Sequence, residues 1–271
     1  MKLKNAFIIL GMAGLISACA TNPFTGKKTM ALVPNSQLFP TSFAQYDQFL
    51  SENKVVTGTS DAAMVTRVGQ KIAVAAERWL NANGHVGYLN DYKWEYKLVD
   101  DKTINAWCMP GGKIVVYTGI LPVTKNEAGL AAVMGHEVAH ALANHGQQRM
   151  SAAYVQQGVA IAGNVAIKDE ASRNAFNQYY GIGSQVGVML PFSRAHETEA
   201  DKIGLYLMAI AGYNPEEAAE LWKRMSAASN GQAPPELLST HPSNDSRISN
   251  LTALAPEARK EAAKFGVTSF K

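Results

Sequence analysis

Two histidines four residues apart constrain this sequence more than any other feature. His136 and His140 flank Glu137 and two small apolar residues. If the segment is helical, both imidazoles lie on one face, one turn apart, and can bind the same metal ion. Glu137 then points off the axis between the ligands, where its carboxylate can hold a water molecule and take its proton. This spacing is typical of the helix that binds zinc in hydrolases; two surface histidines beside a solvated glutamate are the alternative.

The surrounding sequence predicts that this segment is a helix. Apolar residues recur at helical intervals over residues 130–142. Thr124 and Glu127 have the spacing of a capping box, which places the start of the helix at Thr124. Asn144, His145 and Gly146 supply a stop, and Gly146 can take the left-handed conformation that ends a helix. Gly135, directly before the first histidine, costs a helix about 1 kcal/mol relative to alanine. We therefore expect another backbone to approach closely at Gly135.

A second predicted helix, residues 192–211, carries two carboxylates at the same spacing. Glu197 and Asp201 are four residues apart and so share one face. Two histidines leave a zinc site short of a third protein ligand, for which metallopeptidases commonly use a carboxylate. We predict that Glu197 is this ligand and that Asp201 accepts the ring N–H of a ligand histidine. His196 and Glu199 lie off this face and are predicted not to bind metal; a solvated acidic face is the alternative for the whole cluster.

A further histidine stands late in the chain. His241 precedes a proline and a predicted helix over residues 243–254 that carries Arg247. Held by the proline, His241 could reach the metal cleft as a donor to the transition state or as a reversible extra ligand. A surface histidine before a turn is the alternative. For His85 and His145 the sequence indicates no functional role.

The residues before the histidine helix predict a small sheet. Residues 92–99 alternate apolar and charged side chains, and residues 104–109 and 113–117 form two more apolar runs around a Pro-Gly-Gly turn. The last run leads into the histidine helix, so we predict that this strand lies beside the metal cleft and binds an extended peptide as an additional strand. A plain scaffold sheet is the alternative. The strand residues predicted to bind substrate are Ile114, Val115, Val116 and Tyr117.

The remaining chain is predicted to complete one domain. With 271 residues, of which 47% are hydrophobic, the chain can bury one sizeable core. Residues 151–168 are predicted as helix or loop packing near the cleft, and residues 170–190 as either a mobile flap or an ordinary surface loop. Further helices are predicted over residues 36–50 (interrupted by Pro40), 60–83 (capped by Ser60) and 214–228.

The N-terminus has the pattern of a secretory signal. Lys2 and Lys4 precede an apolar run that is too short to span a bilayer comfortably. The run ends in Leu-Ile-Ser-Ala-Cys19, which resembles the lipobox of bacterial lipoproteins. By that resemblance residues 1–18 are removed, Cys19 is lipidated, and residues 19–35 tether the domain of residues 36–271. An ordinary secreted protein is the alternative.

The net charge and the cysteine count of the chain after signal removal limit the kinds of partner that we expect. Removal of the two N-terminal lysines lowers the net charge from +3 to +1, so nothing points to nucleic acid. The chain has two cysteines, and lipidation of Cys19 leaves Cys108 without a partner in the chain. We predict a buried thiol at Cys108, with a link between two chains as the alternative.

Several motifs together resemble the zinc metallopeptidases of the HtpX and CaaX-prenyl-protease type, over about residues 60–255. The motifs are Asn105-Ala106, Pro110-Gly-Gly-Lys-Ile114, Tyr117-Thr-Gly119, His136-Glu-Val-Ala-His140, Ser193-Arg194, Glu197-Thr-Glu-Ala-Asp201, Thr240-His-Pro-Ser243 and Arg247-Ile248. The resemblance implies an α+β, zincin-type metallopeptidase domain, mostly helical with a small sheet beside the histidine helix. It implies one zinc ion per chain, bound by His136, His140 and Glu197.

The resemblance also implies roles for three further side chains. Glu137 would be the general base and acid of peptide-bond hydrolysis. His241 would cap the metal and regulate access to it, and Arg247 would hold that region or stabilise the oxyanion. The lipobox points to the soluble periplasmic branch of these enzymes, LoiP-like and more distantly BepA-like.

For that branch the implied function is cleavage of unfolded or misassembled envelope proteins. The chain would be anchored by Cys19 in the outer membrane of a Gram-negative bacterium, facing the periplasm, with the outer-membrane assembly machinery as a further partner. The alternatives are a chaperone or assembly factor with little turnover and a structural zinc lipoprotein. Glu137 argues against the last, because a structural zinc site needs no base.

Overall fold

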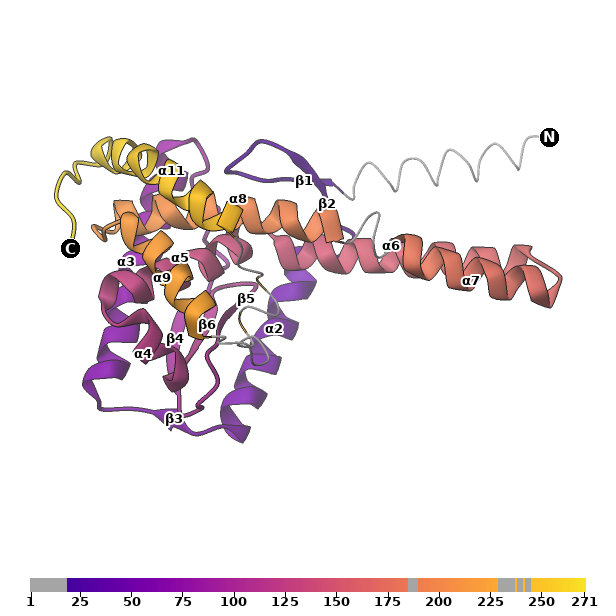
Figure 1. The fold of residues 1–271 in the computed structure, drawn as a ribbon, viewed down its shortest axis with the longest axis horizontal. Coiled ribbons are helices and arrows are strands. Elements are labelled where there is room, and N and C mark those ends of the chain that lie inside the picture. Colours follow the sequence, from indigo (N-terminus) through magenta and orange to yellow (C-terminus); the bar gives the residue numbers. More distant parts are fainter. Residues whose placement is uncertain (1–18, 185–189, 229–236, 238–240, 242–244) are drawn as a thin grey trace. The chain divides into compact units, whose positions relative to one another are not determined.

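The computed structural model describes residues 19–184, 190–228, 237, 241 and 245–271 (Figure 1). The predicted signal, residues 1–18, lies outside the described residues, as do Pro242 and most of the segment before it. The chain divides into two compact units. The smaller comprises residues up to Leu38 together with Asn144–His196, and the larger comprises Phe39–Ala143 with Glu197–Lys271. That residues 36–271 form a single domain stays a prediction.

The larger unit contains a four-stranded sheet in the order β3-β4-β6-β5. β4 and β6 are parallel, with Tyr96 opposite Ile114, whereas the outer strands pair antiparallel to their neighbours. β5 and β6 are joined through Gly111 and Gly112, whose φ angles of +88° and +92° favour glycine. The strands are β3 (Val55–Val56), β4 (Glu95–Val99), β5 (Ala106–Met109) and β6 (Lys113–Tyr117).

The prediction that β6 binds substrate at the sheet edge is wrong. β6 lies between β4 and β5 and pairs with both, so its backbone groups are already used. The prediction placed the last strand in sequence at the edge, but the chain returns to insert it inside. An uninterrupted run of fully buried residues is typical of such a central strand. The strand residues concerned are Ile114, Val115, Val116 and Tyr117, of which the first three are fully buried.

Helix α5 (Glu127–Leu142) forms the centre of the larger unit, and every residue from Ala128 to Leu142 is buried. Its N-cap is Asn126, whose side chain accepts a hydrogen bond from the Gly129 backbone at 2.9 Å. The predicted capping box at Thr124 is therefore wrong. Thr124 instead ends the short helix α4 (Leu121–Thr124), which follows the 3₁₀ turn of Thr118–Ile120.

The end of α5 lies at the predicted stop, but the left-handed residue is Asn144 rather than Gly146. The helix stops at Leu142, and Asn144 takes the left-handed conformation with φ of +56°. Asparagine tolerates this region better than other residues that have a side chain. Gly146 is therefore not the terminator, because the next helix, α6 (His145–Ala166), has already begun.

Four other helices surround α5 or flank the sheet. α3 packs against both α5 and β4, and its cap is Thr59 rather than the predicted Ser60. α2 continues through Pro40, and α11 continues through Pro256 well beyond its predicted end. α9 packs against α5 and α11. These helices are α2 (Asn35–Glu52), α3 (Ser60–Ala82), α9 (Glu216–Ala228) and α11 (Asp245–Ala263).

Two glycines allow α5 to approach helix α8 (Leu190–Ile210) closely. A Cβ atom on Gly135 would lie 2.8 Å from the Gly204 carbonyl oxygen, and one on Gly204 would lie 2.8 Å from the His136 nitrogen. Real Cβ atoms do not come so close to backbone, so each position requires glycine. The expectation of a close backbone approach at Gly135 is confirmed, and Gly204 is the residue that approaches.

The smaller unit consists of a strand pair and two antiparallel helices. β1 (Cys19–Thr21) pairs with β2 (Lys28–Met30), which contacts α6. α6 packs along α7 (Glu170–Ser184), so the segment predicted as a flap or a loop is mostly helical. Within the described part of the chain, no helix has both the length and the apolar character needed to cross a membrane. The predicted fold class, mostly helical with small sheets, is confirmed.

Replacement of Gly204 by alanine tests the close approach of α5 and α8. Its Cβ would meet backbone atoms that cannot rotate away, and such overpacking costs about 1–3 kcal/mol. We expect Gly204→Ala to lower the thermal unfolding midpoint and to weaken zinc binding about tenfold or more, since α8 must move relative to α5.

Gly158→Ala in α6 is the matched control. A Cβ there meets nothing within 4 Å. Alanine in a helix is favoured over glycine by about 1 kcal/mol, so this change should preserve or raise stability. Normal zinc affinity in Gly204→Ala would show that zinc binding does not depend on the close approach of α5 and α8.

Candidate metal centre

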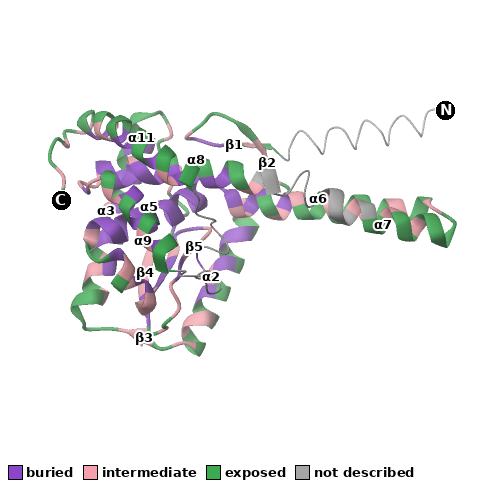
Figure 2. Cartoon of the chain, in the orientation of Figure 1, coloured by how far each residue is buried: buried purple, intermediate pink, exposed green. Residues whose placement is uncertain are grey.

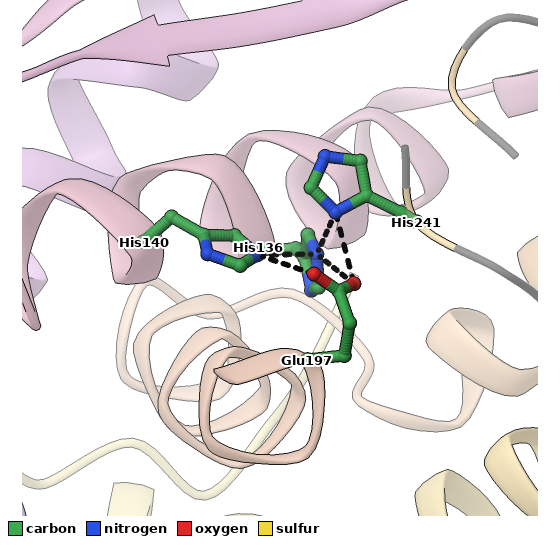
Figure 3. Close-up of side chains that lie close together, drawn as sticks. All are labelled: His136, His140, Glu197 and His241. Carbon is green, nitrogen blue, oxygen red and sulfur yellow. Dashed lines mark hydrogen bonds and ion pairs between the residues drawn. The ribbon is translucent and has the colours of Figure 1, made fainter. Parts of the chain in front are cut away.

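Four side chains of the larger unit converge on one point (Figure 3). The Nε2 atoms of His136 and His140 are 3.1 Å apart, and each lies 3.2–3.3 Å from an oxygen of Glu197. His241 completes the group, with its Nδ1 2.9 Å from Glu197 Oε2 and 3.2 Å from His136 Nε2. One ligand atom from each of the four residues lies within 4.8 Å of all the others.

The donor set fits zinc. Imidazole nitrogens and a carboxylate oxygen are usual zinc ligands, at about 2.0–2.2 Å from the ion. In a tetrahedral arrangement such ligand atoms are about 3.3 Å apart, close to the separations among His136, His140 and Glu197. The three residues predicted as ligands are thus brought together, and His241 is placed as a fourth.

Asp201 lies where the sequence places it, one turn after Glu197 and beside His136. The Nδ1–H of His136 donates to Asp201 Oδ1 at 2.9 Å, which leaves Nε2 facing the ligand group. Arg247 in turn donates from Nε and Nη2 to the two oxygens of Asp201, at 2.8 and 2.6 Å. This bidentate pair orients the carboxylate, which orients the ring of the histidine.

The charges in this cluster compensate one another despite deep burial. Burial and the Arg247 guanidinium lower the pKa of His136, but the carboxylates of Asp201 and Glu197 outweigh them and raise it to about 9. Burial raises the pKa of Asp201 and Glu197, yet Arg247 and the histidines hold both below their ordinary values. Both acids are therefore ionised, as metal ligation and the bond to His136 require.

Trp222 supports the cluster, and it was not predicted. The Arg247 guanidinium lies 3.6 Å from the centre of the Trp222 ring, and the ring of His136 meets the same indole edge-on at 5.9 Å. In the sequence, Trp222 has only the pattern of one more apolar residue on an amphipathic helix. Arg247 also donates to the His241 carbonyl at 3.2 Å and is 6% exposed.

Glu137 is buried beside the group without being one of its ligands. Its Oε1 has no hydrogen-bond partner among the described residues, and Nε2 of His241 lies 3.6 Å from it. A buried carboxylate oxygen left unbonded is costly and is typical of a functional group.

Cys108 on β5 is half-buried rather than fully buried. Burial and the nearby Glu137 carboxylate raise the pKa of its thiol.

The residues predicted not to bind metal lie outside the group. His196 belongs to the smaller unit, where its ring stacks on His145 at 4.0 Å and bonds to Gln148 at 3.1 Å. Neither Glu199 nor His85 is part of the four-residue group found among the described side chains.

Comparison with known proteins identifies the family. The sequence model of peptidase family M48 matches residues 62–255, well over half of the chain. The chain belongs to peptidase family M48. The expectation of a zinc metallopeptidase family, drawn from the motifs, is thereby confirmed.

Several named peptidases are similar to the chain over much of its length. Mitochondrial metalloendopeptidase OMA1 of Schizosaccharomyces pombe is 43% identical over 176 residues, covering 64% of this chain and 50% of the relative. Human mitochondrial metalloendopeptidase OMA1 is 28% identical over 263 residues, 94% of this chain and 49% of the relative. The β-barrel assembly-enhancing protease of Escherichia coli is 29% identical over 182 residues, 64% of this chain and 37% of the relative. The chain thus spans about half the length of these OMA1 proteins.

Replacement of Asp201 by asparagine tests the support of the metal centre. The amide has one acceptor oxygen where the carboxylate has two, so it cannot accept all the hydrogen bonds that Arg247 and His136 donate to Asp201. Loss of such a supporting contact typically weakens metal binding about 10–100-fold. We expect that loss of zinc affinity in competition with a chromogenic chelator. Glu199→Gln, two residues away on the same helix, is the control and should bind zinc as the wild type does.

Proposed function

We propose that this chain is a zinc-dependent endopeptidase that cleaves unfolded or misassembled proteins of a bacterial cell envelope. The observation that carries the proposal is the position of Glu137. Its buried and unbonded oxygen lies beside three ligands suited to zinc, on the same helix as two of them. A structural metal site has no need of such a group.

The protein groups supply most of the proposed mechanism. Zinc, when bound by His136, His140 and Glu197, acts as a Lewis acid and lowers the pKa of water. Glu137 accepts the proton of the attacking water and returns it to the leaving amine. Asp201 and Arg247 hold the ring of His136 in place throughout, so the ligand face does not have to reorganise during the reaction.

His241 is proposed to cap the centre and to act in catalysis once displaced. Its Nδ1 lies among the ligands while its Nε2 faces Glu137. A ring that leaves the ligand group can donate to the oxyanion, an interaction typically worth about 3 kcal/mol. Arg247 is fully engaged by Asp201, Trp222 and the His241 carbonyl. Of its two predicted roles, these contacts favour holding the region over binding the oxyanion.

An extended substrate is proposed to pair with β5 rather than β6. β5 is the outer strand of the sheet and packs against α5, which carries the histidines. The outer edge of β5 can take up a polypeptide as an additional strand, and this mode of binding suits unfolded chains because backbone bonds provide most of the affinity.

The proposed location is the outer membrane, with the domain facing the periplasm of a Gram-negative bacterium. The lipobox-like sequence before Cys19 supports it, and so does the likeness to a bacterial protease named for β-barrel assembly. Cys19 is exposed and follows residues that lie outside the described part of the chain. The OMA1 relatives are mitochondrial, but the bacterial type of signal leads us to favour the envelope. Unfolded polypeptides and the outer-membrane assembly machinery are the proposed partners.

A second candidate is an assembly factor with the same fold and little turnover. His241 favours it, because a histidine that completes the ligand group leaves no open position for water. Under this proposal the protein would act mainly by binding outer-membrane proteins.

Replacement of Glu137 by glutamine tests the peptidase. The change keeps the shape of the side chain but removes the base, so zinc content should stay near one per chain. Casein cleavage should fall about 100-fold or more. His140→Ala removes a ligand and should lose the zinc itself. Full cleavage by Glu137→Gln would exclude the proposed mechanism.

Replacement of His241 by alanine separates the two candidates. If the ring caps the centre, its removal opens a ligand position and casein cleavage becomes faster at unchanged zinc content. Zinc without cleavage in both the wild type and His241→Ala would instead favour the assembly factor.

A further inference from the structure

Helix α6 presents its apolar face to solvent. Eight exposed residues form two adjacent helical rows that together cover nearly half of the helix circumference. Figure 2 colours much of α6 as exposed. None of them is polar apart from the tyrosine hydroxyl. The largest exposed fractions are 79% for Val165 and 59% for Ile161. The eight residues, here called the α6 face, are Tyr154, Val155, Gly158, Val159, Ile161, Ala162, Val165 and Ala166.

The opposite side of α6 is covered by α7. The ring of Phe176 packs where Gly163 has no side chain. Asn164 and Asn177 exchange two side-chain hydrogen bonds, at 2.8 and 2.9 Å. Tyr180 donates to the Gln156 carbonyl at 3.1 Å. Over residues 150–166 the exposed residues of α6 are therefore apolar apart from Gln157 and the Tyr154 hydroxyl, whereas Asn164 is turned to the neighbouring helix. A helix that packs onto a core has its apolar residues on the covered side instead.

This stretch also lacks charge. No residue from 150 to 167 is ionisable, apart from the Tyr154 phenol, and the flanking residues Arg149 and Lys168 are both exposed bases. From residue 19 on, the smaller unit contains six lysines and arginines against two acids, Asp169 and Glu170, a net charge of +4. The mature chain as a whole has a net charge of only +1, so positive charge is concentrated in the unit that exposes the apolar helix.

The N-terminal segment of the same unit is fastened to the start of α6. The Leu32 backbone donates to Ser151 at 3.0 Å, and Gln147 donates to the Val33 carbonyl at 2.7 Å. β1 begins at Cys19 and is paired with β2, which ends at Met30, two residues before this contact. Met30 and Leu32 are exposed as well, at 46% and 38%.

We propose that the α6 face lies on the surface of an anionic bilayer. An exposed apolar stripe in a positively charged unit matches lipid tails below anionic headgroups. α6 has 22 residues but is not apolar enough to span a membrane, so it would lie in the interface. Contact of the α6 face with the bilayer does not depend on a lipid anchor. If Cys19 is lipidated as proposed, the anchor and the α6 face belong to the same unit and would meet the same membrane.

Flotation with vesicles tests the proposal without the lipid anchor. The protein is the chain from residue 19, which contains every described residue, made without lipid. We expect it to bind vesicles of phosphatidylethanolamine and phosphatidylglycerol, and to bind phosphatidylcholine vesicles much less. Binding to the anionic vesicles should weaken in about 0.5 M salt, where charges are screened within a few ångström.

Substitutions on the α6 face should abolish this binding. Val155, Val159 and Ile161 are changed together to glutamate in one variant and to glutamine in a second, which adds no charge. The affinity of each variant for the anionic vesicles should fall about tenfold or more, because the apolar contact is lost. The control places three glutamates on the exposed side of α7, at Ala171, Asn174 and Ala175, and should retain most of the binding.

Three results would overturn the proposal. The first is a wild type that does not bind anionic vesicles. The second is a glutamine variant that binds as well as the wild type. The third is a wild type that forms dimers lost in both variants and ignores vesicles, which would make the α6 face a contact between copies of this chain. Zinc content and casein cleavage in solution should be unchanged in all variants, so loss of the peptidase and loss of vesicle binding can be told apart.

Discussion

The metal centre depends on how closely two helix backbones approach. α5 carries two histidines and α8 carries Glu197 and Asp201, and no side chain separates the helices where Gly135 meets Gly204. Helices separated by ordinary side chains pack at about 8–10 Å between axes. A carboxylate side chain is short, so Glu197 can reach both imidazoles only from a nearby helix. The glycines thus set the distance at which the ligands meet.

The second requirement is compensation of buried charge. A carboxylate or guanidinium buried alone costs several kcal/mol, and here Glu197, Asp201 and Arg247 are buried beside two buried histidines and the half-buried His241. The cost is offset because each carboxylate has polar partners: Arg247 forms an ion pair with Asp201, and the ring nitrogens of the histidines lie within hydrogen-bond distance of Glu197. Trp222 adds an aromatic face beneath Arg247 in place of water. Glu137 has no such partner at its Oε1 among the described residues. This is expected of a group that has to gain and lose a proton during the proposed reaction.

The sequence predicts the ligands better than it predicts their surroundings. Histidines and carboxylates at a spacing of four identify helix faces directly, because helical geometry is local. The position of β6 depends instead on the order of strands across the sheet, which no local pattern of Ile114 or Val115 reveals. Cap residues are similarly ambiguous, since Thr124 and Asn126 both suit the start of α5. Trp222 was missed because an indole that supports an arginine has the same periodicity as one that fills a core.

The local pattern is least informative for α6 and α7, since it leaves helix or loop open for residues 151–168 and indicates a flap or loop for residues 170–190. These helices belong to the segment between Ala143 and Glu197, and the left-handed Asn144 begins it directly after the histidine helix. A metal held by His140 and Glu197 therefore closes a loop of chain that contains the whole segment. The entropy of closing a flexible loop grows slowly with length, by about 0.6 kcal/mol per doubling. The same pair of ligand helices can thus enclose segments of very different length. The segment between Ala143 and Glu197 can therefore be replaced by one with a different surface at little cost to metal binding.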